Sequence, residues 1–144
     1  MPTVSAPGKA HLIGEYAVID NQPAIIASIN KRTFVTAEKD DDITIDASKL
    51  DFKGKFSVDE VFHSSKQATD ILERCNKKEG KERFKELEDY LERDKIEPLK
   101  VITGKSLELL DLNSGVSLDI NSEIPMGAGL GTSASLSVTV PAAT

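Results

Sequence analysis

The residues best suited to chemistry form a glycine-rich run from Pro125 to Ser135, with the sequence PMGAGLGTSAS. Three glycines at alternate positions let the backbone approach a ligand closely and turn its amides inward. Thr132 and Ser133 follow the last glycine and suit the first turn of a helix, where free amides and the helix dipole favour an anion. The run therefore predicts a phosphate-binding loop. A flexible glycine-serine connector is the alternative, which a position between a strand and a helix disfavours.

Two common phosphate-binding motifs do not fit this run. The dinucleotide fingerprint GxGxxG, counted from Gly127, requires a glycine where Thr132 stands. A Walker A loop requires a lysine after its last glycine, and Thr132 again occupies that position. The GKS tripeptide at 104–106 lacks the first Walker glycine, because Leu99 stands five residues before it. The loop is therefore a phosphate cradle of another kind.

The elements that must position this loop are predicted from periodicity and turn residues. Val116, Leu118 and Ile120 alternate with polar residues, which is typical of a half-buried strand leading into the glycine run. Before that strand, a helix is expected to begin near Pro98 and to stop at Gly115. Short strand-like runs are expected at 11–19, 24–29, 33–37 and 43–45, and amphipathic helices around 71–75 and 84–91.

This order of elements predicts an α+β fold of two layers, in which helices cover one face of a sheet. No repeat and no flexible linker is visible, so residues 1–144 are expected to form one domain. Acids and bases interleave densely between Glu73 and Glu97, a pattern typical of a solvated helix face, and no function is assigned to that segment.

Composition excludes several classes of protein. The net charge of −6 argues against nucleic-acid binding, which needs a basic face. Residues 124–144 carry no charge, but glycines, prolines and hydroxyl residues interrupt them too often for a membrane span. A single cysteine cannot form a disulfide within the chain, and one cysteine with two histidines cannot form a cysteine-rich zinc site. This cysteine usage indicates a reducing, cytoplasmic setting.

Two segments of the sequence resemble the motifs of the GHMP kinases, a family named for galactokinase, homoserine kinase, mevalonate kinase and phosphomevalonate kinase. Ala6-Pro7-Gly8-Lys9, continued by GEYAV at 14–18, is similar to the first family motif, and residues 125–134 are similar to the second. The motifs occur in the family's order, so the resemblance covers essentially the whole chain. It implies the two-layer fold of the GHMP N-terminal domain, which is like the second domain of ribosomal protein S5.

The resemblance implies phosphoryl transfer from ATP to an alcohol, with Mg²⁺ as the second cofactor. Ser133 would hold Mg²⁺ and the phosphates, and Lys9 would lie beside the accepting hydroxyl, where its charge favours the anionic transition state. Glu15 and Tyr16 would shape the substrate pocket. The implied phosphate-binding residues are Pro125, Gly127, Ala128, Gly129, Leu130, Gly131, Thr132, Ser133 and Ala134.

The implied acceptor is mevalonate, because the glycine run is similar to that of the members that phosphorylate it. Tyr16 departs from those members, which usually carry histidine there, and phosphomevalonate is therefore the alternative acceptor. A non-catalytic nucleotide-binding module is the alternative from another class. Neither a nucleic acid nor a membrane is an expected partner, and the resemblance allows a homodimer for the complete protein.

The family's Mg²⁺-binding glutamate, its aspartate base and its third glycine motif belong to regions beyond the loop helix. Since the chain stops at Thr144, it is expected to be truncated inside that helix and to lack the C-terminal domain. The 144 residues alone are accordingly expected to be inactive.

Overall fold

The computed structural model of the chain describes residues 3–15, 21–79 and 82–144. Its strands are β1 (Thr3–Ile13), β2 (Ile25–Asp40), β3 (Ile43–Ala47), β4 (Phe52–Phe56) and β5 (Gly115–Ser122), with a 3-10 turn η2 (Ser48–Leu50) before β4. Its helices are α1 (Val58–Asn76), α2 (Lys85–Glu92), α3 (Glu97–Leu109) and α4 (Thr132–Ala143).

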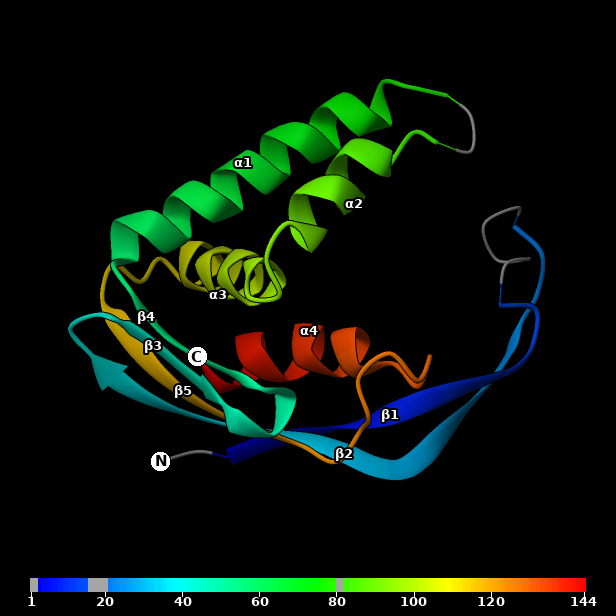
Figure 1. The fold of residues 1–144 in the computed structure, drawn as a ribbon, viewed down its shortest axis with the longest axis horizontal. Helices are drawn as coiled ribbons and strands as arrows, with labels where there is room; N and C mark the ends of the chain where they lie inside the picture. The colour runs from blue at the N-terminus through cyan, green and yellow to red at the C-terminus, as the bar shows by residue number, and fades with distance from the viewer. Residues whose placement is uncertain (1–2, 16–20, 80–81) are drawn as a thin grey trace.

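The described strands form one mixed sheet in the order β1-β2-β5-β3-β4. Neighbouring strands are antiparallel except for β3 and β5, which run parallel. The four described helices lie on one side of the sheet, with α4 against β1 and β2, α3 beside α4, and the α1–α2 hairpin outermost (Figure 1). The predicted α+β class, with helices on one face, is confirmed.

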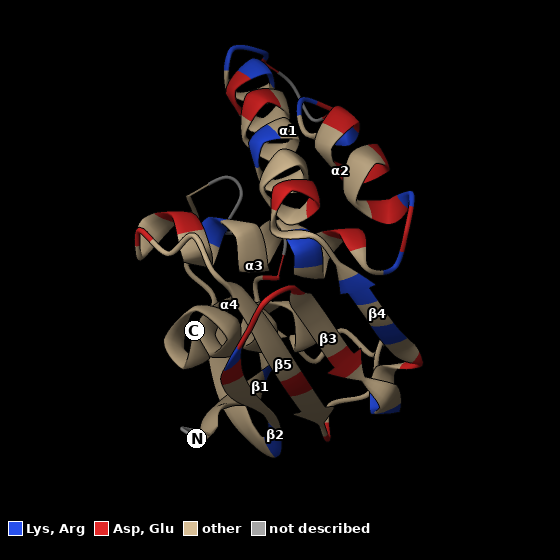
Figure 2. Cartoon of the chain, turned by 90° about the vertical axis from the view of Figure 1, so that its left-hand side faces the viewer, with Lys and Arg blue, Asp and Glu red and all other residues tan. Residues whose placement is uncertain are grey.

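The core lies between the sheet and the helices because each strand turns alternate residues inward. Val116, Leu118 and Ile120 of β5 are buried, as their alternation predicts. They share the core with apolar residues of the other elements, namely Val35, Ile43, Ile45, Val61, Leu99, Leu107, Leu136 and Val140. Both α1 and α2 carry acidic and basic residues, with acidic ones in the majority on α2, whereas α4 carries neither (Figure 2).

Several element bounds differ from those predicted. β1 begins at Thr3 and ends at Ile13, so the strand predicted at 11–19 was wrong in its bounds, and residues 16–20 lie outside the described part. The runs at 24–29 and 33–37 belong to one long strand, β2. β4 was not predicted, because its sequence FKGKF is short and interrupted by a glycine.

The helix predicted to stop at Gly115 ends earlier, at Leu109. Asp111 takes the left-handed conformation that follows the helix, with φ of 55°. Gly115 instead opens β5, where a Cβ atom would collide with the backbone of Asp41 and Asp42. The glycine is therefore required by a close approach of two chain segments, which local sequence does not reveal.

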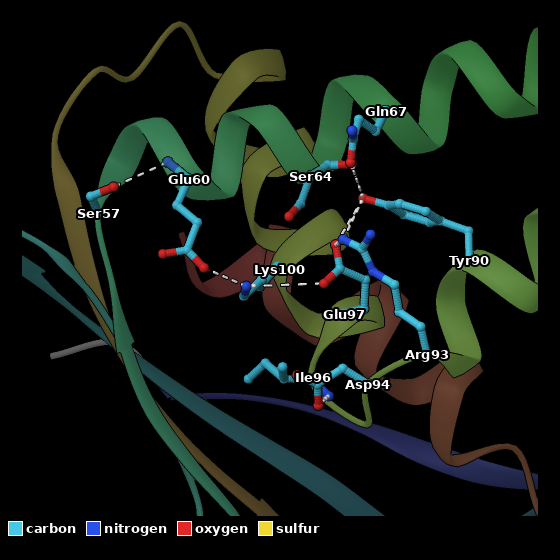
Figure 3. A network of polar contacts seen from close by, with 10 residues as sticks. All are labelled: Ser57, Glu60, Ser64, Gln67, Tyr90, Arg93, Asp94, Ile96, Glu97 and Lys100. Carbon is cyan, nitrogen blue, oxygen red and sulfur yellow. Dashed lines mark hydrogen bonds and ion pairs between the residues drawn. The ribbon is translucent and has the colours of Figure 1, made fainter.

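A buried polar network joins α1, α2 and α3 (Figure 3). The carboxylate of Glu97 on α3 is only 3% exposed and accepts a hydrogen bond of 2.8 Å from the hydroxyl of Tyr90 on α2. It pairs with Arg93 at 3.0 Å, and Lys100 lies 4.0 Å away. Lys100 in turn pairs with Glu60 of α1. Glu97, at the end of the charge-dense segment, is thus buried rather than on a solvated face.

The Glu97 carboxylate is expected to make folding stability depend on acid pH. Burial alone would raise its pKa, but hydrogen bonds from Ser64, Tyr90 and Arg93 lower the pKa below the ordinary 4.5. A lowered native pKa contributes stability that is present above the unfolded-state pKa and lost as the pH falls through the native pKa. Glu97→Gln should therefore cost about 1–3 kcal/mol at pH 7 and less near pH 3, measured by urea unfolding.

Glu86→Gln is the matched control for this prediction. Glu86 also has a pKa lowered by its partners, Arg74 and Lys78, but its side chain is more than one third exposed. Exposed ion pairs contribute little to stability. Equal acid dependence of the Glu97 and Glu86 variants would contradict the importance of the buried carboxylate.

Candidate functional site

The loop between β5 and α4 has a backbone that requires its glycines. Gly127, Gly129 and Gly131 have φ values of 71°, 69° and 81°, in the left-handed region that side chains disfavour. A Cβ atom added at Gly127 or Gly129 would meet nothing within 4 Å. The two glycines thus border open space, as a cradle for a ligand requires.

The N-terminus of α4 faces the same loop. The helix begins at Thr132, as predicted, and its N-cap is Gly131, so no side chain caps the first amides. The hydroxyl of Thr132 donates to the carbonyl of Pro125 at 3.3 Å and closes the base of the loop. Ser133, in the first turn, is exposed. Free amides at a helix N-terminus, beside open space, are suited to bind an anion.

Strand β1 brings the first motif against this loop. The backbone amide of Lys9 donates to the carbonyl of Leu130 at 2.9 Å. At Gly8, a Cβ atom would lie 2.8 Å from that carbonyl, so glycine allows the strand and the loop to touch. A Cβ atom at Gly131 would come within 2.6 Å of Cγ of Lys9. The two motifs are therefore in direct contact, although more than 110 residues separate them in sequence.

An open cleft of about 380 Å³ lies where these elements meet. Its lining is Lys9, Glu15, Gly127, Gly129, Leu130, Gly131, Thr132, Ser133 and Ala134. Of the other predicted site residues, Pro125 lies at the loop base and Ala128 is exposed in the loop. Tyr16 lies outside the described residues. The cleft thus places one lysine and one glutamate beside the glycine loop.

Lys9 contacts His11, and sequence reasoning missed this contact. The ammonium of Lys9 lies 2.9 Å from Nδ1 of His11, and the carboxylate of Glu15 lies 3.8 Å from the same nitrogen. The His11 side chain is only 13% exposed. Lys9 and His11 are two residues apart on one strand, so their side chains share a face. His11 can hold the ammonium at the cleft by accepting its hydrogen bond.

A second, apolar cavity of about 160 Å³ adjoins the cleft. The two share Gly127, Thr132 and Ser133. The rest of the lining is apolar except for Lys95, and comes from Leu50, Phe52, Lys95, Pro98, Leu99, Ile102, Met126 and Leu136. Sequence reasoning missed this cavity because η2, β4, α3 and α4 each supply only a few of its residues. A polar cleft joined to an apolar cavity fits a ligand with an anionic group at one end and an apolar group at the other.

The described residues contain no group of three or more histidine, cysteine, aspartate or glutamate side chains that could hold a metal ion. Mg²⁺ usually keeps several waters and takes most of its other ligands from substrate phosphates, with one or two from the protein. The exposed hydroxyl of Ser133 beside the cradle fits one such ligand. Among the described helices, none is long and apolar enough to cross a membrane.

The chain is similar in sequence and in fold to known proteins. Residues 98–144 match the family model described as the GHMP kinases N terminal domain. The mevalonate kinase of Pyrococcus abyssi is 35% identical over 141 residues, which cover 93% of this chain and 35% of that protein. The chain belongs to the GHMP kinase family. Its glycine loop and α4 lie within the part that matches the GHMP model.

Further relatives of this GHMP chain include the mevalonate kinase of Arabidopsis thaliana, 27% identical over 154 residues and covering 96% of this chain and 40% of that protein. The crystal structure of the Methanococcus jannaschii mevalonate kinase has the same fold, with a TM-score of 0.70 and 20% identity over 99% of this chain and 38% of that one. The chain thus spans little more than a third of the length of these relatives.

Proposed function

We propose that the protein carrying this chain is a mevalonate kinase, which transfers the γ-phosphoryl group of ATP to the primary hydroxyl of mevalonate. The product would be 5-phosphomevalonate, an intermediate of isoprenoid biosynthesis. The observation that carries the proposal is the shared cleft, in which Lys9 of the first motif lies against the glycine loop of the second. The relatives named mevalonate kinase support the choice of acceptor.

The two adjoining cavities suggest how the nucleotide would lie. The phosphates would take the cleft, where the loop backbone and the free amides of α4 favour negative charge. The base would take the apolar cavity between Phe52, Leu99 and Leu136. Mg²⁺, when bound with ATP, neutralises phosphate charge, and Ser133 would be its ligand from this chain.

Lys9 would act on the transferred group. Its ammonium lies at the cleft beside the N-terminus of α4, where it would stabilise the charge that develops on the phosphoryl oxygens and on the acceptor hydroxyl. His11 would hold the ammonium in place by accepting its hydrogen bond. Glu15 and Tyr16 are proposed to contact the acceptor.

Ser133→Ala is expected to weaken the binding of MgATP about fivefold to tenfold, because one oxygen ligand of Mg²⁺ is removed. The affinity for ATP without Mg²⁺ should hardly change. Calorimetric titrations with and without Mg²⁺ measure both quantities. The control is Ser137→Ala, which removes a hydroxyl one turn later on the exposed side of α4. Equal losses with and without Mg²⁺ would contradict the role of Ser133.

We propose residues 1–144 as one domain, the N-terminal ATP-binding domain of the kinase. Because relatives are covered to only 35–40% of their length, we expect no turnover by these residues alone. The same proposal holds that the acceptor is a small molecule, that the setting is cytoplasmic and that the complete protein is a homodimer.

Phosphomevalonate kinase is the alternative, favoured by Tyr16, and a non-catalytic nucleotide-binding module is the other. An assay of ADP release by the complete gene product, with mevalonate or phosphomevalonate as acceptor, distinguishes all three.

A further inference from the structure

Helix α3 has two faces with different surroundings. Pro98, Leu99 and Ile102 line the apolar cavity. Glu97 and Lys100 belong to the buried polar network with α1 and α2. With 3.6 residues per turn, these two sets lie on roughly opposite sides of the helix. The network therefore contacts the face of α3 that carries Glu97 and Lys100, while the opposite face forms a wall of the cavity.

We propose that Glu97 is a positioning residue for the nucleotide base: by anchoring the first turn of α3 to α1 and α2, it sets the width of the apolar cavity. This inference rests on the proposed binding of ATP, with the base in that cavity. It gives the charged α1–α2 hairpin, whose described residues line neither the cleft nor the apolar cavity, an effect on nucleotide affinity.

Glu97 contacts α2 and the segment just after it directly, and it is linked to α1 through Tyr90 and Lys100 (Figure 3). Tyr90 of α2 donates to its carboxylate, and the same hydroxyl lies 3.2 Å from the backbone carbonyl of Ser64 on α1. Arg93, just after α2, pairs with the carboxylate at 3.0 Å. A buried carboxylate that loses its partners is costly, so this arrangement strongly favours one position of α3.

The residues on either side of Glu97 link the position of α3 to the shape of the cavity. Lys95 and Pro98 both line the cavity. Ile96 between them is only 2% exposed, its amide faces the carboxylate of Asp94, and its carbonyl accepts from the amides of Leu99 and Lys100. A shift of Glu97 would therefore move this turn, and with it one wall of the cavity.

The phosphate cleft should not respond to such a shift. Its lining comes from β1, the turn after β1, the glycine loop and the first turn of α4, and includes no residue of α1, α2 or α3. Loss of the anchor should consequently weaken binding of the base and leave binding of the phosphates unchanged. A general loss of folding would weaken both, so the two effects can be separated.

The test compares MgATP with magnesium tripolyphosphate, which has the phosphates but no base. Calorimetry on the complete gene product is expected to show MgATP affinity about tenfold weaker for Glu97→Gln and a smaller loss in the same direction for Tyr90→Phe. The affinity for tripolyphosphate should stay within twofold for both. Glu86→Gln, on the same hairpin but paired only with Arg74 and Lys78, should match the wild type with both ligands.

Two outcomes would overturn the inference while the proposed function stands. One is unchanged MgATP affinity in both variants, and the other is an equal loss for MgATP and tripolyphosphate. If Glu97→Gln does not fold, the test rests on Tyr90→Phe alone, because that variant keeps the aromatic ring and loses only the hydroxyl. Failure of the wild type to bind MgATP would instead refute the proposed function, and the inference with it.

Discussion

Replacing Lys9 with methionine is expected to lower kcat about 100-fold or more, while the affinity for MgATP changes only severalfold. Methionine keeps an unbranched apolar side chain, one atom shorter than that of lysine, and removes the charge. Lys9 lies at the cleft beside the free amides of α4, where a positive charge acts mainly on the anionic transition state. Steady-state ADP release by the complete gene product, together with calorimetry, gives both quantities.

Lys105→Met is the matched control, because Lys105 is a lysine of α3 that pairs with Glu108 and lines neither the cleft nor the apolar cavity. It should leave kcat within twofold. Lys9→Arg should recover part of the activity, since it restores the charge in a larger side chain. A Lys9→Met enzyme with near-normal kcat would refute the assignment of Lys9.

The second large effect is expected at the glycine loop. Gly129→Val should weaken MgATP binding about 100-fold, for two reasons. The φ of 69° is strongly unfavourable for a β-branched residue, so the loop must change its backbone. In addition, the side chain would point into open space that we assign to the phosphates. Calorimetric titration with MgATP measures the loss.

Gly131→Ala extends this prediction to the contact between the motifs. Its Cβ atom would meet the side chain of Lys9, so both nucleotide binding and kcat should fall. The control for both glycine variants is Ala142→Val, which adds a β-branched side chain on the exposed side of α4, far from the loop. Normal MgATP affinity in Gly129→Val would show that the phosphates bind elsewhere.

The features that sequence predicted well depend on neighbours along the chain. The alternating glycines, the hydroxyl pair and the preceding strand are local patterns, and the structure confirms the strand β5 and the start of α4 at Thr132. The meeting of Lys9 with the loop was implied by the resemblance to the GHMP kinases, since no local pattern joins residues so far apart. The roles of the site residues stay predictions.

The features that sequence missed depend on distant segments. The apolar cavity combines Phe52, Leu99 and Leu136 from three elements, and one of those elements, β4, was itself not predicted. Glu97 ends a stretch whose mixed charges indicate a solvated helix face, but the packing of α1 and α2 against α3 buries its carboxylate. Only the fold shows which acidic residue of such a stretch is buried.

Phosphoryl transfer to mevalonate is tested most directly by ADP release from the complete gene product, with MgATP present and mevalonate as acceptor. We expect turnover with mevalonate that exceeds turnover with phosphomevalonate, and loss of that turnover in Lys9→Met. A preference for phosphomevalonate would identify the alternative kinase. MgATP binding without ADP release with either acceptor would contradict the proposed enzyme activity and favour the non-catalytic nucleotide-binding module.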